Sequence, residues 1–368
     1  MKSKMKILLI SSMYPSKEQP SYGIFVKNFI NALSQRGVLF DKTVISGRGH
    51  NVSEKIIKHI RFFLDCTFLL RRGDFDIAYI HWAGLSLLPL MWSKNKKPFI
   101  INVHGEDVLP RSLFGKLIKR LVFGIVRSAD LVVVPSSFML QKMIEQYGIS
   151  EDRLFISASG GINNKLFSPS PTIRDSSNIT FGYTSRVDEG KGWDIFLNAA
   201  RLLESEDVNK FNLIFVGGGG QLDELKALVS RYAMNCNVSI AGPLPQDDLP
   251  SSFHQMDVFV FPTTLNESLG LVGLEAMACG LPVIGSMKGG LESYIRNGKN
   301  GFLFVSGDYV DLAEKMKKFI NMSVQEKLRY RQAAIQTADE YTSDRVASGM
   351  LEKLRLVVEN RRKRIASI

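Results

Sequence analysis

Two glutamates, Glu267 and Glu275, stand on either side of what the sequence predicts to be the start of a helix. An apolar run at 258–261 precedes them, and a glycine and a proline follow, so the predicted order is strand, loop, helix and stop. If the helix begins near Gly270, free backbone N–H groups lie between the two carboxylates and attract phosphate. Such a site suits a ligand with hydroxyl groups on both sides of a diphosphate, as in a nucleotide sugar. The alternative is one solvated glutamate and one that caps the helix.

Two cations that could neutralise a diphosphate follow an earlier strand. Arg186 and Lys191 bracket a glycine-containing loop after the predicted strand 179–184. The later strand 211–216 runs into four glycines, which resembles half of a dinucleotide fingerprint. However, the third glycine position holds Leu222 and the next strand ends without an acid for a ribose, so the pattern argues against an NAD site.

A second polar cluster follows the predicted strand 99–103 in the first half of the chain. His104, Glu106 and Asp107 lie at the strand end where the ligands of parallel sheets gather. A histidine beside two acids can position a sugar hydroxyl or handle a proton, whereas the simpler interpretation is a histidine that caps the next helix. Gly23, between the first strand and the first helix, either lets the backbone approach a phosphate or a sugar, or is only a turn.

The Asp-Phe-Asp motif at 74–76 matches a pattern that holds a divalent ion in some sugar transferases. It precedes the predicted strand 77–80, at the N-terminal end, whereas ligands of open parallel sheets bind at the carboxyl ends. We therefore expect no metal there. An odd number of cysteines without metal-ligand spacing also favours a reducing compartment with buried thiols: Cys66, Cys236 and Cys279.

Positive charge is concentrated in the first half of the chain. The 368 residues carry a net charge of +11, and the first 170 hold 24 Lys and Arg against 12 Asp and Glu. Two amphipathic helices predicted at 54–72 and 111–127 contribute many of these cations. A basic half suggests an anionic partner, and such helices either lie in a membrane interface or pack on a sheet. No basic–aromatic surface accompanies the charge, which argues against a nucleic-acid partner.

Two sets of alternating strands and helices organise the chain, the second of which begins at 179 after a polar linker at 168–178. This alternation is typical of parallel, doubly wound α/β sheets. We predict one Rossmann-like domain at 1–170, a second at 171–345, and a C-terminal helix at 346–368 that crosses back to the first. No apolar run reaches the length of a transmembrane helix or a signal-peptide core, so we expect a cytoplasmic protein.

In this order and at these spacings, the motifs resemble glycosyltransferase family 4, the retaining transferases with the GT-B fold. The resemblance runs through nearly the whole chain. It rests on the Glu267/Glu275 pair, the Arg-x4-Lys-Gly loop at 186–192, the Ala-Met-Ala-Cys-Gly-Leu-Pro-Val run at 276–283 and the glycine pair at 289–290. It implies an α/β fold of two Rossmann-like domains that face each other across a cleft, no metal or organic cofactor, and a nucleotide sugar as co-substrate.

The resemblance also implies a role for each motif. Glu275 would hold the ribose hydroxyls, Glu267 would contact the donor sugar near its 3-hydroxyl, and Arg186 and Lys191 would neutralise the leaving diphosphate. His104 would contact the donor sugar from the first domain. The other residues expected near the nucleotide are Ser268, Leu269, Gly270, Leu271, Gly217, Gly242 and Leu244, and those expected near the acceptor are Tyr22, Gly23, Glu106 and Asp107.

Three positions depart from the family pattern. Ser185 stands where glycine is usual, Ser268 stands in a context where glycine is common, and Tyr22 replaces the first glycine of a pair that ends at Gly23. The first two substitutions are compatible with the roles above, whereas the third changes the acceptor loop.

The sequence therefore predicts a retaining, metal-independent hexosyltransferase. It would move a sugar from a UDP- or GDP-type donor to a glycan or polyprenyl-linked acceptor in surface-polysaccharide biosynthesis, with peripheral contact to the anionic inner face of the plasma membrane. The alternatives are a nucleotide-sugar epimerase or phosphorylase of the same fold, and a non-catalytic nucleotide-sugar-binding subunit.

Overall fold

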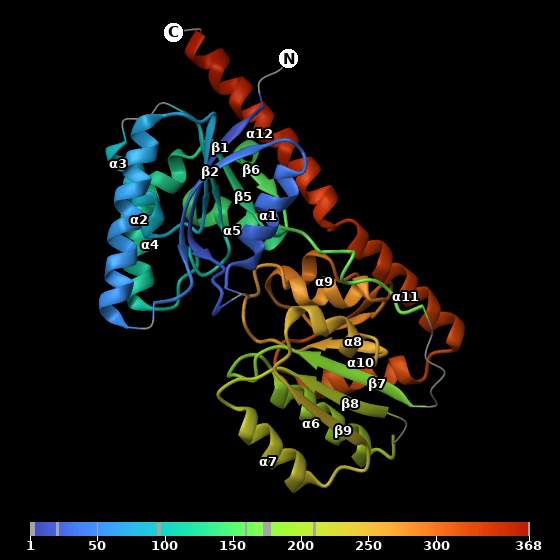
Figure 1. Ribbon diagram of the computed structural model, residues 1–368. Coiled ribbons are helices and arrows are strands. Elements are labelled where there is room, and N and C mark those ends of the chain that lie inside the picture. The colour runs from blue at the N-terminus through green and yellow to red at the C-terminus, as the bar shows by residue number, and fades with distance from the viewer. Residues whose placement is uncertain are drawn as a thin grey trace. The chain divides into compact units, whose positions relative to one another are not determined.

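The structure is a computed structural model that describes residues 4–19, 22–49, 51–93, 97–158, 160–171, 178–208 and 211–366. The chain divides into two compact units (Figure 1). Unit 1 comprises Met1–Gly161 and Ser343–Ile368, and unit 2 comprises Ile162–Thr342. The boundaries expected from the sequence, at 170/171 and 345/346, lie nine and three residues later in the chain, respectively. Part of the expected linker, 172–177, lies outside the described residues.

Unit 1 contains a six-stranded parallel sheet in the order β2-β1-β3-β4-β5-β6. The strands are β1 (Lys6–Tyr14), β2 (Leu39–Ser46), β3 (Ile77–His81), β4 (Phe99–Asn102), β5 (Leu131–Val134) and β6 (Leu154–Ile156). The helices are α1 (Ile24–Ser34), α2 (Val52–Arg72), α3 (Leu88–Trp92), α4 (Leu113–Ser128), α5 (Ser137–Tyr147) and α12 (Ser343–Ala366), with short 3-10 turns at η1 (Leu85–Leu87) and η2 (Glu151–Arg153).

The two faces of this sheet are covered by different helices. Successive strand residues point to opposite faces, so Leu8 and Ile10 lie in one buried cluster while Ile7 and Leu9 lie in another. The first cluster receives buried residues of α2, α4 and α5, and the second those of α1 and α12. In Figure 1, α2 and α4 lie on one side of the unit 1 strands, and α1 and α12 lie on the other. The C-terminal helix is therefore part of the unit 1 core.

Unit 2 repeats the plan with the strand order β12-β11-β10-β7-β8-β9, again all parallel. The strands are β7 (Ile179–Thr184), β8 (Phe211–Val216), β9 (Asn237–Gly242), β10 (Val258–Phe261), β11 (Val283–Ser286) and β12 (Gly301–Phe304). The helices are α6 (Trp193–Ser205), α7 (Leu222–Tyr232), α8 (Leu249–Phe253), α9 (Leu271–Ala278), α10 (Tyr309–Ile320) and α11 (Val324–Asp339), with 3-10 turns at η3 (Gln246–Asp248) and η4 (Gly289–Ser293).

The predicted fold class, α/β with two Rossmann-like units, is confirmed by these two parallel sheets. Two edge strands, β2 and β12, were not expected. β2 pairs only with β1 and contains Asp41 and Lys42, so its sequence lacks the continuous apolar run that marks a central parallel strand. Among the described residues, no helix combines the length and the apolar character that crossing a membrane requires.

Candidate active site

The start of α9 in unit 2 packs closely against its own unit, and no side chain caps its first N–H groups in the described part of the chain. Gly270 is the N-cap residue and has a φ of 82°, a left-handed conformation that glycine adopts without strain. A Cβ atom there would lie 2.7 Å from Cδ2 of Leu291 and 2.9 Å from Cε1 of Phe261. Because the first N–H groups of a helix lack intrahelical partners, they can bind an anion.

Lys191 and Glu267, expected from the sequence to serve the same ligand, form an ion pair. Nζ of Lys191 donates to Oε1 of Glu267 at 2.7 Å, and the side chains are only 15% and 18% exposed. Oγ1 of Thr263 lies 3.2 Å from this carboxylate oxygen and 3.2 Å from the carbonyl oxygen of Gly190, so its proton can serve either acceptor. Thr263 was not among the expected site residues. Its position two residues after β10, at the carboxyl edge of the sheet, was the signal in the sequence.

Glycines bring the backbone segments of this site close together. Gly192 has a φ of 76°, and a Cβ atom there would lie 1.9 Å from the carbonyl oxygen of Pro262. The N–H of Gly290 donates to the carbonyl of Glu267 at 2.7 Å, and a Cβ on Gly290 would lie 2.4 Å from the carbonyl oxygen of Ser268. The two glycine motifs therefore fix the backbone on which Glu267 and Lys191 stand.

Arg186 lies on a more exposed part of the same unit. Its Nη1 donates to Oδ2 of Asp188 at 2.6 Å, and its side chain is 71% exposed. Oδ1 of Asp188 accepts the N–H of Gly220 at 2.7 Å. Asp188 was not among the expected site residues. It links the loop that carries Arg186 and Lys191, here called the cation loop, to the four-glycine segment at 217–220. The sequence signal for this ion pair was the spacing, since an acid two residues after the arginine can reach its guanidinium.

Glu275 lies in the second turn of α9. Its Oε1 accepts a hydrogen bond from Nε2 of Gln246 at 3.1 Å. Burial raises the pKa of Glu275 to about 7, and the bond from Gln246 acts in the opposite direction. Gln246 belongs to η3 and was not identified from the sequence, because only the fold brings η3 beside α9.

The other expected donor-side residues lie at strand or helix ends of unit 2. The N–H of Gly217 donates to the carbonyl of Gly242 at 2.7 Å, and a Cβ on Gly217 would lie 1.8 Å from the carbonyl oxygen of Ser185. The ends of β7, β8 and β9 therefore meet at the cation loop. Leu269 is buried, whereas the three others are half-buried: Leu244, Ser268 and Leu271.

The raised pKa of Glu275 predicts a pH-dependent donor affinity. If ribose hydroxyls donate to the Glu275 carboxylate, binding requires this group to be ionised. With a pKa of about 7, the ionised fraction of Glu275 increases as the pH rises from about 6 to about 8. Affinity for a nucleotide sugar, whose diphosphate does not titrate in this range, should increase about tenfold. Titration calorimetry at several pH values measures this. The Glu275→Gln variant should show a flat profile, and a flat profile for the unchanged protein would contradict the assignment.

In unit 1, His104 follows β4 and lies among aromatic rings. Its ring centroid is 4.6 Å from that of Phe25 and 6.2 Å from that of Trp82, whose ring is nearly parallel at 15°. Nε2 of His104 lies 3.2 Å from Nδ1 of His81, so one of these nitrogens carries the shared proton. Burial lowers the pKa of His104 to about 3, so the ring is neutral near pH 7. A neutral imidazole can position a sugar hydroxyl through a hydrogen bond.

The two acids after His104 differ in their surroundings. The buried carboxylate of Asp107 accepts N–H groups of Ala83 at 2.9 Å, His104 at 3.0 Å and Gly105 at 2.8 Å. Asp107 therefore holds the loop that carries His104. Burial raises the pKa of Asp107. Glu106, by contrast, is exposed.

Tyr22 and Gly23 lie at the start of α1, after β1. Gly23 has a φ of 69°, and a Cβ there would lie 2.6 Å from the carbonyl carbon of Met13. The Tyr22 ring lies 5.1 Å from the guanidinium carbon of Arg48. Together with Met13, these three residues line a surface hollow of about 490 Å³. Arg48 was not expected from the sequence, and it supplies positive charge to this hollow.

The Asp-Phe-Asp motif lies at the N-terminal end of β3. Asp74 pairs with Lys6 at 2.7 Å and with Arg72 at 3.5 Å, and the hydrogen bond from Lys6 lowers the pKa of Asp74. Asp76 accepts from Arg362 at 2.9 Å. Both aspartates are therefore paired with cations of the chain itself. A search of the described residues finds no cluster of His, Cys, Asp or Glu suited to a metal ion.

Comparison with known proteins shows two matching families that follow one another along the chain. The model described as Glycosyltransferase Family 4 matches residues 23–158, and the one described as Glycosyl transferases group 1 matches residues 166–338. The chain is 29% identical to a D-inositol 3-phosphate glycosyltransferase of Corynebacterium jeikeium over 86% of its length and 88% of the relative. It is 24% identical to the putative colanic acid biosynthesis glycosyltransferase WcaL of Escherichia coli, over 69% of the chain and 65% of the relative.

A solved structure shows the same fold. The Anabaena protein Alr3699/HepE, crystallised in complex with UDP, superposes with a TM-score of 0.75 at 19% identity, over 95% of this chain and 100% of that one. The two family matches, the relatives and the pair of parallel sheets show that this chain belongs to glycosyltransferase family 4, with the GT-B fold.

Proposed function

We propose that this glycosyltransferase moves a hexose from a UDP- or GDP-type nucleotide sugar to a glycan or polyprenyl-linked acceptor, with retention at the anomeric carbon. The observation that carries the donor assignment is the mostly buried ion pair of Lys191 and Glu267 beside the uncapped start of α9. A cation and free N–H groups suit a diphosphate, while a carboxylate suits sugar hydroxyls.

The reaction breaks the bond between the anomeric carbon and the diphosphate oxygen and forms a bond from that carbon to an acceptor hydroxyl. In our proposal, Lys191 and Arg186 meet the charge that grows on the leaving diphosphate, and the N–H groups near Leu269 and Gly270 add hydrogen bonds. Such preorganised electrostatic stabilisation is often the largest catalytic contribution. No step of this proposal uses a metal or an organic cofactor. The configuration at the anomeric carbon is retained if the acceptor hydroxyl attacks this carbon from the same face that the diphosphate leaves.

The remaining candidate residues would contact the donor or the acceptor. Glu275 would accept hydrogen bonds from the ribose, and Glu267 would accept one from the transferred sugar near its 3-hydroxyl. The neutral ring of His104, held by the Asp107 loop, would contact the same sugar. Glu106 and the Tyr22–Gly23 segment would serve the acceptor.

The known proteins support the proposed classes of donor and acceptor. The Anabaena protein has been solved with UDP and also with UDP-glucose, which favours a UDP-type donor. The name of the Corynebacterium jeikeium relative refers to inositol 3-phosphate, a phosphorylated acceptor, and that of the Escherichia coli relative refers to the biosynthesis of colanic acid.

A thermal-shift panel of nucleoside diphosphates and their sugars tests the donor assignment. A UDP or GDP sugar at saturating concentration should raise the Tm by about 2–4 °C. The matching monophosphate, which lacks the second phosphate, should raise it less. If no member of the panel stabilises the protein, the donor assignment is wrong.

We also propose that the protein works at the cytoplasmic face of an anionic membrane, on the basis of its basic first half. Binding to anionic vesicles should weaken as salt rises from about 0.05 to about 0.5 M, because counterions screen the attraction. Vesicle sedimentation measures this, with uncharged vesicles as the control. Binding that does not change with salt, or no binding to anionic vesicles, would contradict the proposal.

A further inference from the structure

The helices α2 and α4 of unit 1 expose large apolar side chains. Leu113, at the start of α4, is 84% exposed, and Phe68, near the end of α2, is 66% exposed. Other exposed members of this apolar face are Ile56, Ile60, Leu64, Phe114, Leu117 and Leu121. Contiguous apolar surface of this kind is uncommon on soluble monomers and marks an interaction site.

Positive charge lies on the same two helices. Arg61 on α2 and Lys116 and Arg120 on α4 are exposed between the apolar residues. An apolar surface interspersed with cations matches a ligand that joins hydrocarbon to negative charge, as an anionic lipid does. It does not match a purely apolar partner, which would leave these charges without a complement.

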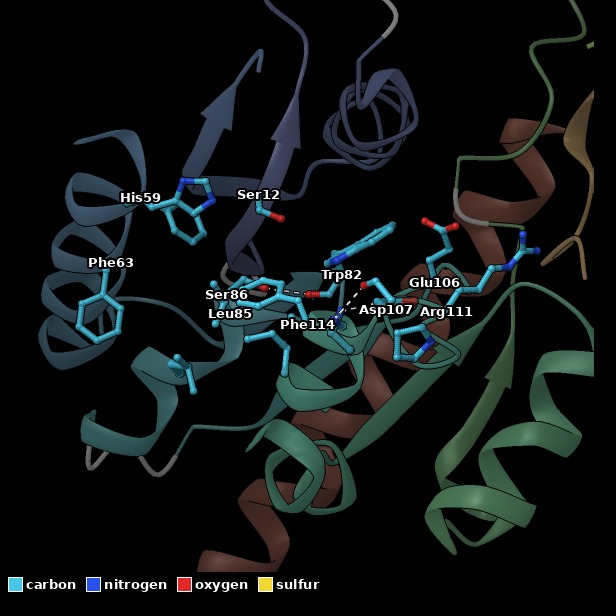
Figure 2. Close-up of a pocket in the computed structure, with 18 residues that line it drawn as sticks. Ser12, His59, Phe63, Trp82, Leu85, Ser86, Glu106, Asp107, Arg111 and Phe114 are labelled. Carbon is cyan, nitrogen blue, oxygen red and sulfur yellow. Dashed lines mark hydrogen bonds between the residues drawn. The ribbon is translucent and has the colours of Figure 1, made fainter. Parts of the chain in front are cut away.

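A cavity of about 540 Å³ lies beneath this face, between α2, η1 and α4 (Figure 2). Its apolar walls include Phe62, Phe63, Leu85, Leu88, Phe114 and Ile118. A second hollow of about 430 Å³ shares Phe63, Leu85 and His59 with it. The two hollows therefore lie on either side of the same side chains, and the second is lined by the exposed residues Ile56, Ile60 and Leu64 of the apolar face.

The other end of the cavity is polar. Figure 2 shows His59 and Phe63 on one side of the cavity, and Glu106 and Arg111 on the other, with Trp82 between them. A ligand that fills this space must therefore have a hydrocarbon end and a polar end.

Trp82 connects the cavity to the expected acceptor side of unit 1. It has a φ of 75°, which is strained for a bulky residue and typical of functional sites. This turn is held because the N–H of Trp82 donates to the carbonyl of Asn102 at 3.0 Å and the N–H of Ala83 donates to Asp107 at 2.9 Å. The indole lines the cavity and lies parallel to the His104 ring. The polar end of the cavity therefore adjoins the residue assigned to the sugar.

We propose that this cavity holds the first part of the hydrocarbon chain of a lipid-linked acceptor, with its phosphate toward Arg111. The inference rests on the proposed function and specifies the acceptor as an amphiphile rather than a free glycan. The chain would leave the membrane through the apolar face of α2 and α4, and its sugar end would reach Glu106. Bulk anionic lipid, which also joins hydrocarbon to phosphate, is the alternative occupant that the experiment must exclude.

Direct binding of farnesyl diphosphate, a short prenyl diphosphate, to the full chain tests the proposal. Tryptophan fluorescence below the critical micelle concentration of the probe gives the Kd. The test variant is Phe114→Ser and the matched control is Leu113→Ser. Both residues are exposed apolar neighbours at the start of α4, but only Phe114 lines the cavity. Phe114→Ser should weaken binding about fivefold or more, whereas Leu113→Ser should leave the Kd within about twofold.

Three results would overturn the proposal: no binding of the probe, equal weakening by both variants, or complete displacement of the probe by phosphatidylglycerol vesicles. Equal weakening would mean adsorption to the outer face, and displacement would assign the cavity to bulk lipid. Thermal shift by the nucleotide sugar is measured on the same samples. A retained shift without probe binding rejects the lipid cavity alone, whereas a missing shift rejects the donor assignment. The Leu85→Ser variant gives a second cavity position if Phe114→Ser fails to fold.

Discussion

The Lys191→Ala variant should lower kcat by about 10²–10³-fold. In the unchanged protein, the ammonium group of Lys191 would stabilise the negative charge on the departing diphosphate. Removal of one preorganised donor of this kind typically lowers kcat by such a factor. The same change leaves Glu267 without its 2.7 Å partner in a mostly buried position. We therefore expect a loss of about 1–3 kcal/mol in the free energy of unfolding. Steady-state transfer assays and denaturant titration measure the two effects separately.

A matched control exists on the surface of the same unit. Lys317 pairs with Glu206 at 2.6 Å, but both side chains are 44% exposed. Lys317→Ala should leave both kcat and stability nearly unchanged, because exposed pairs contribute little. If Lys191→Ala lowered stability but left kcat intact, Lys191 would be a structural partner of Glu267 and not a contact to the diphosphate.

The two glutamates should separate binding from transfer. Glu275→Ala should weaken nucleotide affinity about 10- to 100-fold, because hydrogen bonds between ribose hydroxyls and a charged group are lost. Glu267→Ala should leave affinity within about threefold and lower kcat by about 10²-fold, because its contact to the sugar matters most in the transition state. Calorimetry with the nucleotide sugar and initial-rate assays provide the two quantities.

The outcomes of this pair of variants also discriminate between functions. The reverse pattern would mean that the two ends of the donor are assigned the wrong way round. A non-catalytic subunit would bind the donor without turnover, and Glu267→Ala would then change binding alone. An epimerase would release an altered sugar without any acceptor. Chromatography of acceptor-free reactions tests that possibility.

Much of the sheet architecture could be predicted from the sequence. The bounds of β7, β8 and β10 match the expected strands because buried parallel strands are continuous apolar runs with clear ends. Two edge strands were missed: β2 because polar residues interrupt its apolar pattern, and β12 because it is only four residues long and begins at a glycine. Edge strands tolerate polar residues and short lengths, so their sequences do not stand out.

The motifs in the sequence determined the family and the identity of most candidate residues, because glycine positions and the spacing of charges follow from local backbone geometry. The tertiary structure decided how these residues are paired. Lys191 meets Glu267 across 75 intervening positions, and His81, at the end of β3, meets His104 in the loop after the neighbouring strand β4. The cavity beside Trp82 likewise depends on α2 and α4 packing on one face of the sheet. Contacts between segments far apart in the chain leave no local pattern, so only the fold reveals them.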